Sequence, residues 1–204
     1  MQHVRPAPVP LSTRHPVGAS VEDDPLIVLI GGTAGCGKTT LANRLVAHLD
    51  LDHRIGTGFI RAVLQSQTDP AVDPLLFRHT YESDDPLGNL QAQALRLLPA
   101  VRSCVDRAHA EGTSLVVEGT HLLPDLYHDA GARFVVLEPP DPIEHRRRLH
   151  GRHARRSITI GDLAAARAIG DLYRSEAARL GVPSLHYGDN LAEIASLLAA
   201  PPPG

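Results

Sequence analysis

A single lysine stands in a loop built to bind phosphate. The chain has 204 residues and 20 lysines and arginines together, and Lys38 is its one lysine. Residues 32–39, Gly-Thr-Ala-Gly-Cys-Gly-Lys-Thr, match the G-x-x-x-x-G-K-[ST] phosphate-binding loop in full. A compact ammonium on a flexible stem reaches the β- and γ-phosphates of a nucleotide in a way that a planar guanidinium does not. The motif predicts a nucleoside-triphosphate site in which Lys38 is catalytic.

The whole loop and the residue after it are predicted to contact the nucleotide. Its glycines let backbone N–H groups turn inward around an anion. The Thr39 hydroxyl is also a predicted Mg²⁺ ligand. Cys36 is interpreted as a small filler at a variable position. The predicted nucleotide-binding residues are Gly32, Thr33, Ala34, Gly35, Cys36, Gly37, Lys38, Thr39 and Thr40.

A buried strand and a helix must position this loop. Residues 26–30 are continuously apolar, as in a strand buried on both faces of a parallel sheet. Thr39 and Thr40 open a predicted helix that runs to about Leu49. Bound phosphate then lies at a helix N-terminus, where unpaired N–H groups and the helix dipole favour negative charge.

Strand-like and helix-like segments alternate along the rest of the chain. Apolar runs at 114–118 and 133–137, with a weaker one at 183–187, predict strands, and a short strand is expected at about 54–56. This alternation predicts an α/β fold, a P-loop NTPase with a parallel sheet covered by helices on both faces. Its domain is expected at 25–200, between disordered tails at 1–24 and 201–204. The predicted helices lie at about 86–111, 141–150, 160–180 and 190–199.

Ligands in such sheets bind beyond the carboxyl ends of the strands, so the residues after the second strand are candidates for an acceptor site. Thr57-Gly58 predicts a turn, followed by a helix with Arg61 in its first turn. Residues 76–82 predict a polar, aromatic loop that carries Arg78 and Tyr81. The two arginines are predicted to clamp a phosphate or carboxylate bidentately. The alternative for each is a surface or helix-capping role.

The third predicted strand ends in Glu118-Gly119-Thr120-His121. An acid at this position holds Mg²⁺ or orients the attacking hydroxyl, so Glu118 is a predicted catalytic residue and metal ligand. His121 is a candidate for a hydrogen bond to the acceptor, with a purely structural role as the open alternative.

An arginine-rich segment at 145–156 is predicted to form a lid at about 145–160. Arginines that close over the γ-phosphate neutralise charge and exclude water. Arg148, Arg152 and either Arg155 or Arg156 recur at helical spacing, and Arg148 and Arg152 are the catalytic candidates. A nucleic-acid patch and a solvated helix face are the alternatives. Which arginine reaches the phosphate stays open.

Composition narrows the function further. A net charge of −3 and a pI near 6.4 disfavour a dedicated nucleic-acid binder. The two cysteines lie far apart without a metal-binding pattern, which favours a reduced, cytoplasmic setting. No apolar stretch reaches membrane-spanning length, so no membrane partner is expected. The oligomeric state stays open.

From the phosphate loop to about residue 190, the chain resembles the 2-phosphoglycerate kinase family of P-loop kinases, within the nucleoside-monophosphate-kinase-like superfamily. The most specific shared string is Glu-Gly-x-His-Leu-x-Pro at 118–124. The resemblance implies ATP- and Mg²⁺-dependent phosphorylation of 2-phosphoglycerate, with Lys38, Thr39, Arg61 and Glu118 in the active site. Further matching segments are 60–61, 76–81, 111–112, 167–169, 171–172 and 181–183.

One departure from the family bears on the acceptor. The family often reads Thr-Asp-Ser-Ile-Arg-Glu where this chain has Thr-Gly-Phe-Ile-Arg-Ala at 57–62. The missing aspartate is a base or a Mg²⁺ partner, and the sequence present is similar to the Thr-Gly-x-x-x-Arg turn that holds AMP in adenylate kinases. Glu118 is the leading candidate to replace that aspartate. The alternative is that no base is required, because a loose transition state places little demand on one.

The sequence thus predicts a kinase that phosphorylates a hydroxyl of a small anionic metabolite, 2-phosphoglycerate or a related hydroxy acid. A nucleoside-monophosphate-type kinase is an alternative, and so is a nucleotide-binding regulator without catalysis. An RNA 5′-hydroxyl or toxin-type kinase is a further alternative.

Overall fold

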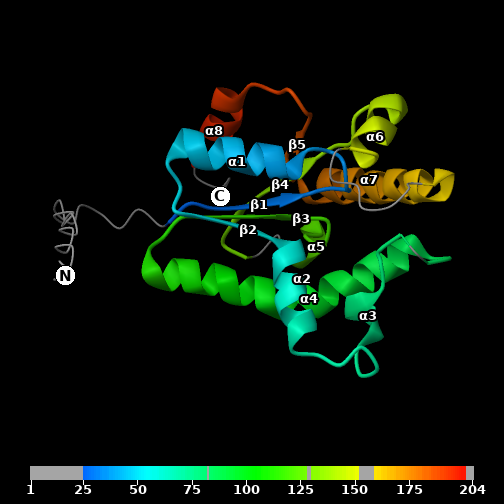
Figure 1. The fold of residues 1–204 in the computed structure, drawn as a ribbon. Helices are drawn as coiled ribbons and strands as arrows, with labels where there is room; N and C mark the ends of the chain where they lie inside the picture. The colour runs from blue at the N-terminus through cyan, green and yellow to red at the C-terminus, as the bar shows by residue number, and fades with distance from the viewer. Residues whose placement is uncertain (1–24, 82, 128–129, 152–158, 201–204) are drawn as a thin grey trace, which may run out of the picture.

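A five-stranded parallel sheet lies between two layers of helices (Figure 1). The computed structural model describes residues 25–81, 83–127, 130–151 and 159–200. The strand order is β2-β3-β1-β4-β5, and every pair of neighbours is parallel. The predicted P-loop NTPase architecture is thereby confirmed. The predicted tails at 1–24 and 201–204 lie outside the described residues.

The elements have the following bounds. The strands are β1 Ile27–Gly31, β2 His53–Gly56, β3 Leu115–Gly119, β4 Arg133–Leu137 and β5 Ser184–Leu185. The helices are α1 Lys38–Leu49, α2 Thr57–Ser66, α3 Pro74–Phe77, α4 Pro86–Glu111, α5 Pro124–Tyr127, α6 Pro142–Leu149, α7 Ile160–Leu180 and α8 Leu191–Ala199.

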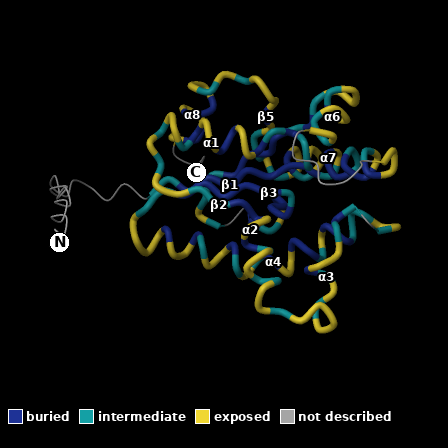
Figure 2. Tube along the Cα trace, viewed as in Figure 1, coloured by how far each residue is buried: buried dark blue, intermediate teal, exposed yellow. Residues whose placement is uncertain are grey.

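Alternate residues of the central strands build two separate cores. Ile27 and Leu29 of β1 face a core shared with α4, α5 and α7. Val28 and Ile30 face a second core formed with α1 and α8. Figure 1 shows α1 and α8 on one face of the sheet and α4 on the other. In Figure 2 the central strands β1 and β3 are buried throughout, while the outer turns of the helices are exposed.

Helix boundaries follow local capping signals. Thr159 and Asp162 form a reciprocal capping box that starts α7. Asp85 accepts a hydrogen bond from the Gly88 N–H at the start of α4, and Pro86 stands at its first position. Gly112 and Gly181 end α4 and α7 with positive φ, a conformation that glycine adopts without strain.

Several predicted boundaries are wrong by a few residues. The helix after the phosphate loop begins at Lys38 rather than Thr39. The predicted Thr57-Gly58 turn is the first turn of α2, so Arg61 lies in the second turn. The loop predicted from residue 76 begins within a single helical turn, α3. The strand predicted at 114–118 is shifted by one residue, and the one at 183–187 is shorter.

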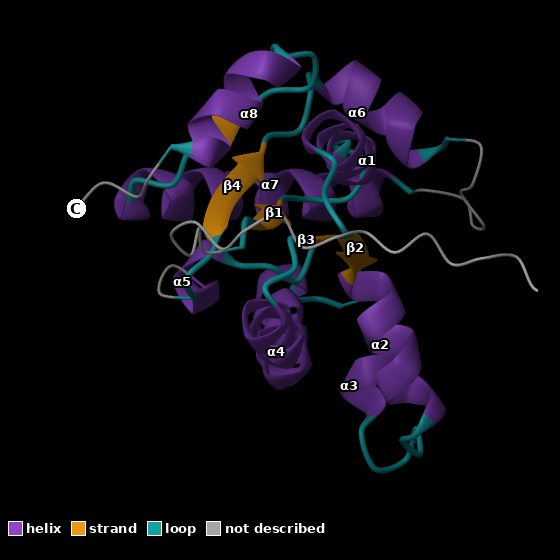
Figure 3. Cartoon of the chain, turned by 90° about the vertical axis from the view of Figure 1, so that its left-hand side faces the viewer, coloured by secondary structure: helices purple, strands orange, loops and turns teal. Residues whose placement is uncertain are grey.

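The end view in Figure 3 shows α2 and α3 extending away from the sheet near the β2 edge. They lie on the same side of the sheet as α4 and contact it through side chains described below. Among the described residues, none of the helices is long and apolar enough to cross a lipid bilayer.

Candidate active site

The phosphate loop connects β1 to α1 at the carboxyl end of the sheet. Gly37, which precedes α1, has a φ of 110°, and a Cβ there would lie 2.7 Å from the Tyr187 ring, so only glycine fits. None of the described side chains caps the α1 N-terminus. Its first N–H groups therefore remain available to an anion.

The nine residues predicted to bind nucleotide do not all face the same space. Gly35, Gly37, Lys38, Thr39 and Thr40 line a cavity of about 560 Å³. Cys36, by contrast, is fully buried in the core beside α1, as a small filler would be. Gly32, Thr33 and Ala34 form the start of the loop, and Thr33 is fully buried.

Lys38 is held inside its own loop. It is 7% exposed, and its Nζ donates a hydrogen bond of 2.7 Å to the Thr33 carbonyl. A buried ammonium needs such an acceptor, since an unpaired buried charge is costly. The contact places the charge beneath the loop that would surround a phosphate.

Thr39 and Glu118 meet as the sequence predicts. The Thr39 hydroxyl donates a hydrogen bond of 2.9 Å to Glu118 Oε1. The same oxygen lies 3.5 Å from Arg54 Nη1, so β2 supplies a cation beside this carboxylate. Gly119 allows the close packing at this strand end, because a Cβ there would lie 1.8 Å from the Thr57 Oγ1. Glu118 and Thr39 thus present oxygen atoms beside the lysine.

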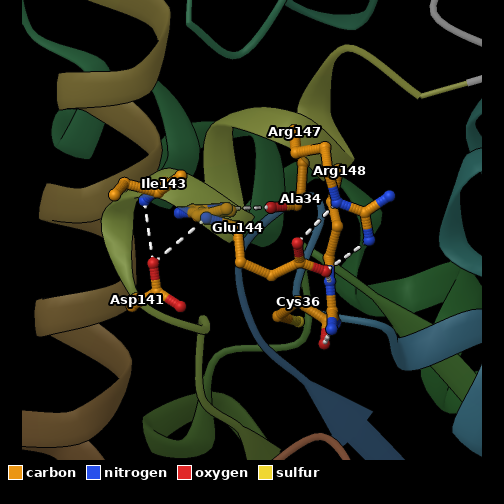
Figure 4. Close-up of polar contacts among 8 residues, drawn as sticks. Ala34, Cys36, Asp141, Ile143, Glu144, Arg147 and Arg148 are labelled. Atoms are coloured by element: carbon orange, nitrogen blue, oxygen red, sulfur yellow. Dashed lines mark hydrogen bonds and ion pairs between the residues drawn. The ribbon is translucent and has the colours of Figure 1, made fainter.

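The far wall of the cavity comes from α6 (Figure 4). Glu144 accepts two hydrogen bonds from Arg147, of 2.5 and 2.6 Å, and one of 2.7 Å from Arg148 Nε. Hydrogen bonds from Arg147 and then Arg148 lower the pKa of Glu144 to about 2. Its carboxylate therefore stays ionised and holds both arginines beside the phosphate loop.

Arg148 has two further contacts that fix its position. Its guanidinium lies 3.8 Å from the centroid of the Tyr187 ring, a cation–π arrangement. Its Nη1 lies 3.5 Å from the Cys36 carbonyl in the phosphate loop. The structure thus brings Arg148, a predicted catalytic residue, to the cavity. The other predicted lid arginines, Arg152, Arg155 and Arg156, lie outside the described residues.

Helix α6, the first part of the predicted lid, is packed against the phosphate loop. His145 is fully buried, and its Nε2–H donates a hydrogen bond of 2.7 Å to the Ala34 carbonyl. Desolvation is the main cause of a lowered pKa for His145, and the hydrogen bond to the Ala34 carbonyl opposes it in part. Residues 145–149, the first part of the predicted lid, are therefore packed against the phosphate loop in this structure.

Arg61 and Arg78 come together, but not as two free guanidiniums. Arg61 Nε donates a hydrogen bond of 2.6 Å to the Leu76 carbonyl, and its Nη2 donates one to the Arg78 carbonyl. Arg61 is half-buried and Arg78 is exposed. In this structure Arg61 supports the backbone of residues 76–78, so the predicted bidentate clamp is not formed in advance.

His121 is buried, and both of its ring nitrogens have partners. Its Nε2 lies 3.2 Å from Gln93 Oε1, and its Nδ1 lies 3.4 Å from the Thr57 hydroxyl. Burial, with nearby Arg61 and Lys38, lowers its pKa to about 3. The predicted hydrogen bond from His121 to an acceptor is not available in this arrangement, and the structural alternative describes the residue better.

His121 is expected to make the protein less stable in mild acid. The folded pKa is about 3 and the unfolded value 6.5, so the unfolded chain binds more protons between these limits. The stabilisation that comes from neutral His121 is fully present above pH 6.5, and it is lost as the pH falls from 6.5 toward 3. Between about pH 7.5 and pH 5, His121 should contribute a loss of about 2 kcal/mol in free energy of unfolding.

Urea unfolding at both pH values measures this loss, with His121→Gln as the comparison. The variant should lose less stability on acidification than the wild-type chain, because His145 remains in both proteins and cancels. Equal losses in the two proteins would show that His121 is not the residue that resists protonation.

Tyr81 links the acceptor side to the phosphate loop. Its phenol oxygen accepts a hydrogen bond of 3.2 Å from the Ala34 N–H. The residue predicted as an acceptor contact thus touches the loop predicted to hold the donor phosphate. Thr57, another predicted acceptor contact, is buried at the N-terminus of α2 beside Gly119.

Sequence reasoning missed several residues that shape this site. Arg54, His145 and Tyr187 are polar residues whose partners are distant in the sequence, whereas Glu144 pairs with arginines of its own helix. Only Glu144 carried a local signal, because it stands three and four residues before Arg147 and Arg148. Gln93, the partner of His121, lies on a regular helix without any such signal.

A comparison with protein-family models shows the family to which this chain belongs. The family model described as AAA domain matches residues 28–167, more than half of the chain. The chain belongs to the AAA domain family. The match includes the phosphate loop, Glu118 and α6.

This AAA domain chain is similar to proteins named 2-phosphoglycerate kinase. It is 27% identical over 198 residues to a 2-phosphoglycerate kinase of Methanothermobacter thermautotrophicus, a match that covers 86% of this chain and 65% of the relative. It is 31% identical over 114 residues to a 2-phosphoglycerate kinase of Methanocaldococcus jannaschii, covering 52% of this chain and 37% of the relative. The predicted resemblance is confirmed, although the chain spans only about a third to two thirds of these relatives.

Solved structures show the same fold. A shikimate kinase from Acinetobacter baumannii, in complex with shikimate, has a TM-score of 0.55 at 13% identity, covering 85% of this chain and 90% of that protein. A tunicamycin resistance protein of Deinococcus radiodurans has a TM-score of 0.53 at 16% identity, covering 87% of this chain and 99% of that protein. At such identities the likeness supports the fold of the AAA domain chain alone.

Proposed function

We propose that this chain is an ATP- and Mg²⁺-dependent kinase that transfers the γ-phosphoryl group to a hydroxyl of a small anionic acceptor. The leading acceptor is 2-phosphoglycerate, which would give 2,3-bisphosphoglycerate. One observation carries the proposal: the Thr39–Glu118 hydrogen bond joins the phosphate loop to the strand end that faces the acceptor elements. The relatives named 2-phosphoglycerate kinase support the choice of acceptor.

The donor side suits a triphosphate. The α1 N-terminus and Lys38 offer positive charge from one wall of the cavity, and Arg147 and Arg148 offer it from the other. Hydrogen bonds to Glu144 hold Arg147 and Arg148 on this wall, which would reduce the reorganisation needed when charge develops on the transferring group. Phosphoryl transfer depends chiefly on such positioning and charge stabilisation.

The residues present also fit Mg²⁺. A hydroxyl and a carboxylate are hard oxygen ligands, and Mg²⁺ is typically bound through one or two protein oxygens together with phosphate and water. Thr39 and Glu118 would hold the ion. When bound, it would neutralise charge on the phosphate oxygens. Arg54, beside Glu118, would keep this carboxylate oriented toward Thr39.

Three residues of the chain have distinct proposed roles in phosphoryl transfer. Lys38 would contact the transferring phosphate, while Arg148 would stabilise charge from the opposite wall. Glu118 accepts a hydrogen bond from Thr39 in this structure and would receive the proton of an attacking hydroxyl. Such a base need only be weak, because the transition state is loose.

A nucleoside monophosphate is the second candidate acceptor, favoured by Thr57-Gly58 with Arg61 after it, although two residues separate Gly58 from Arg61 where the adenylate-kinase turn has three. One observation favours the smaller acceptor. Only 3% of the chain is aromatic, which leaves little surface on which a nucleobase could stack. A three-carbon phosphate needs charge and polar contacts more than stacking.

A competition assay tests the acceptor. With ATP and equal concentrations of 2-phosphoglycerate and AMP, we expect 2,3-bisphosphoglycerate as the main product, resolved by ³¹P NMR or ion-exchange chromatography. An ATP-only reaction measures background hydrolysis. Preferential formation of ADP from AMP would make the chain a nucleotide kinase. Nucleotide binding without transfer to any acceptor would make it a regulator.

A further inference from the structure

A buried glutamine on α4, Gln93, contacts both residues 75–80 and His121 in the proposed acceptor region. Gln93 is 1% exposed, and its side chain makes four hydrogen bonds. Its Nε2 donates to the Leu75 and Arg78 carbonyls, at 3.1 and 2.8 Å. Its Oε1 accepts from the Thr80 hydroxyl at 2.8 Å and faces His121 Nε2 at 3.2 Å. Its hydrogen-bonding capacity is therefore fully used.

These contacts fix the orientation of the amide and, through it, the imidazole. Two carbonyls face Nε2, so the other atom must be the acceptor Oε1. His121 Nε2 then carries the proton, and Nδ1 is left to accept from the Thr57 hydroxyl. A chain of hydrogen bonds thus runs from α4 through His121 to the first residue of α2.

The same glutamine shares a carbonyl with Arg61. Arg61 Nη2 and Gln93 Nε2 both donate to the Arg78 carbonyl, one from α2 and the other from α4. Asn89, one turn earlier on α4, donates to the carbonyls of His79 and Thr80. The backbone of residues 75–80 is therefore held between two helices by side-chain amides and one guanidinium.

We propose that Gln93 is the positioning residue of the acceptor site. It touches no reacting atom, but it sets the backbone that carries Arg78 and selects the His121 tautomer that receives the Thr57 hydroxyl. This inference rests on the proposed function for its kinetic consequence. Its structural consequence, the tautomer of His121, does not depend on any activity.

The kinetic test uses Gln93→Met, which keeps the length of the side chain and removes all four hydrogen bonds. We expect the KM for 2-phosphoglycerate to rise about tenfold or more while the KM for ATP changes less than about twofold. Gln91→Met is the matched control, because Gln91 is exposed on the same helix. A general loss of folded protein would lower kcat alone and leave both KM values in place.

Thr80→Val provides a milder variant and a double-mutant cycle. It removes one of the four contacts, so the acceptor KM should rise about threefold. Because Thr80 acts through Gln93, the double variant should be no worse than Gln93→Met alone. Additive effects would mean that the two residues act independently and would overturn the inference.

The tautomer is read from long-range ¹H–¹⁵N spectra of the imidazole rings, with His121→Gln to assign the signal. The wild-type chain should show His121 protonated at Nε2 and unprotonated at Nδ1. Gln93→Met should populate the other tautomer. An unchanged His121 signal in Gln93→Met overturns the inference alone. If the wild-type chain turns over 2-phosphoglycerate, an acceptor KM that is the same in Gln93→Met as in wild type also overturns it. No turnover by the wild-type chain overturns the proposed function, and with it the kinetic arm.

Discussion

Replacing Lys38 with arginine is expected to lower kcat by about a hundredfold or more, although the charge is unchanged. The Lys38 ammonium is 7% exposed and fits beneath the phosphate loop, 2.7 Å from the Thr33 carbonyl. A guanidinium is wider and planar, so it would displace the loop or leave the space. Steady-state turnover with the preferred acceptor measures the effect.

The control is the reverse exchange, arginine to lysine, at a site remote from the cavity. It is Arg107→Lys on α4, where Arg107 pairs with Glu111 at the protein surface. It should retain wild-type kcat. Circular dichroism and thermal melting confirm that Lys38→Arg is folded. A folded Lys38→Arg chain with turnover within about threefold of wild type would exclude the proposed role.

Replacing Glu118 with glutamine should make turnover strongly dependent on the concentration of Mg²⁺. The neutral amide keeps an oxygen near the Thr39 hydroxyl but loses the charge that a divalent cation requires. We expect kcat at limiting Mg²⁺ to fall about a hundredfold, with partial recovery at high Mg²⁺. Titration of activity against Mg²⁺ measures the shift in the half-saturating concentration.

Glu111→Gln is the matched control, because Glu111 ends α4 at the surface, on an element that does not line the cavity. It should leave the Mg²⁺ titration unchanged. Thr39→Ala should shift the titration in the same direction as Glu118→Gln. A full rate for Glu118→Gln at limiting Mg²⁺ would make Glu118 a structural residue and require another acid.

The parts of the fold that could be predicted from sequence are those encoded by local patterns. The apolar run of β4 and the amphipathic spans of α4 and α7 gave their bounds directly. The start of α2 was misplaced because Thr57 and Gly58 are typical of turns. There, β2 leads directly into the helix, and the packing of Thr57 against Gly119 outweighs the turn preference.

The candidate site divides in the same way. The phosphate loop could be predicted because its function depends on consecutive backbone groups, and the Thr39–Glu118 contact follows from the meeting of strand ends. The contacts on the acceptor side could not be predicted from sequence, because the partners of Arg61 and His121 are set by how α2 and α4 pack. Arg61 is held by the carbonyl of residue 76, and His121 by Gln93, 28 positions away.

The single lysine has a practical consequence. Reagents that acylate amines or form imines with them meet only one side-chain amine in this 204-residue sequence, and that amine lines the proposed nucleotide cavity. An aldehyde or acyl-phosphate derivative of a nucleotide would therefore label one lysine per chain, with no background from surface lysines. Peptide mass mapping would read the occupancy of Lys38 separately from any label on the N-terminal amine, and protection by unlabelled nucleotide would report affinity without any knowledge of the acceptor.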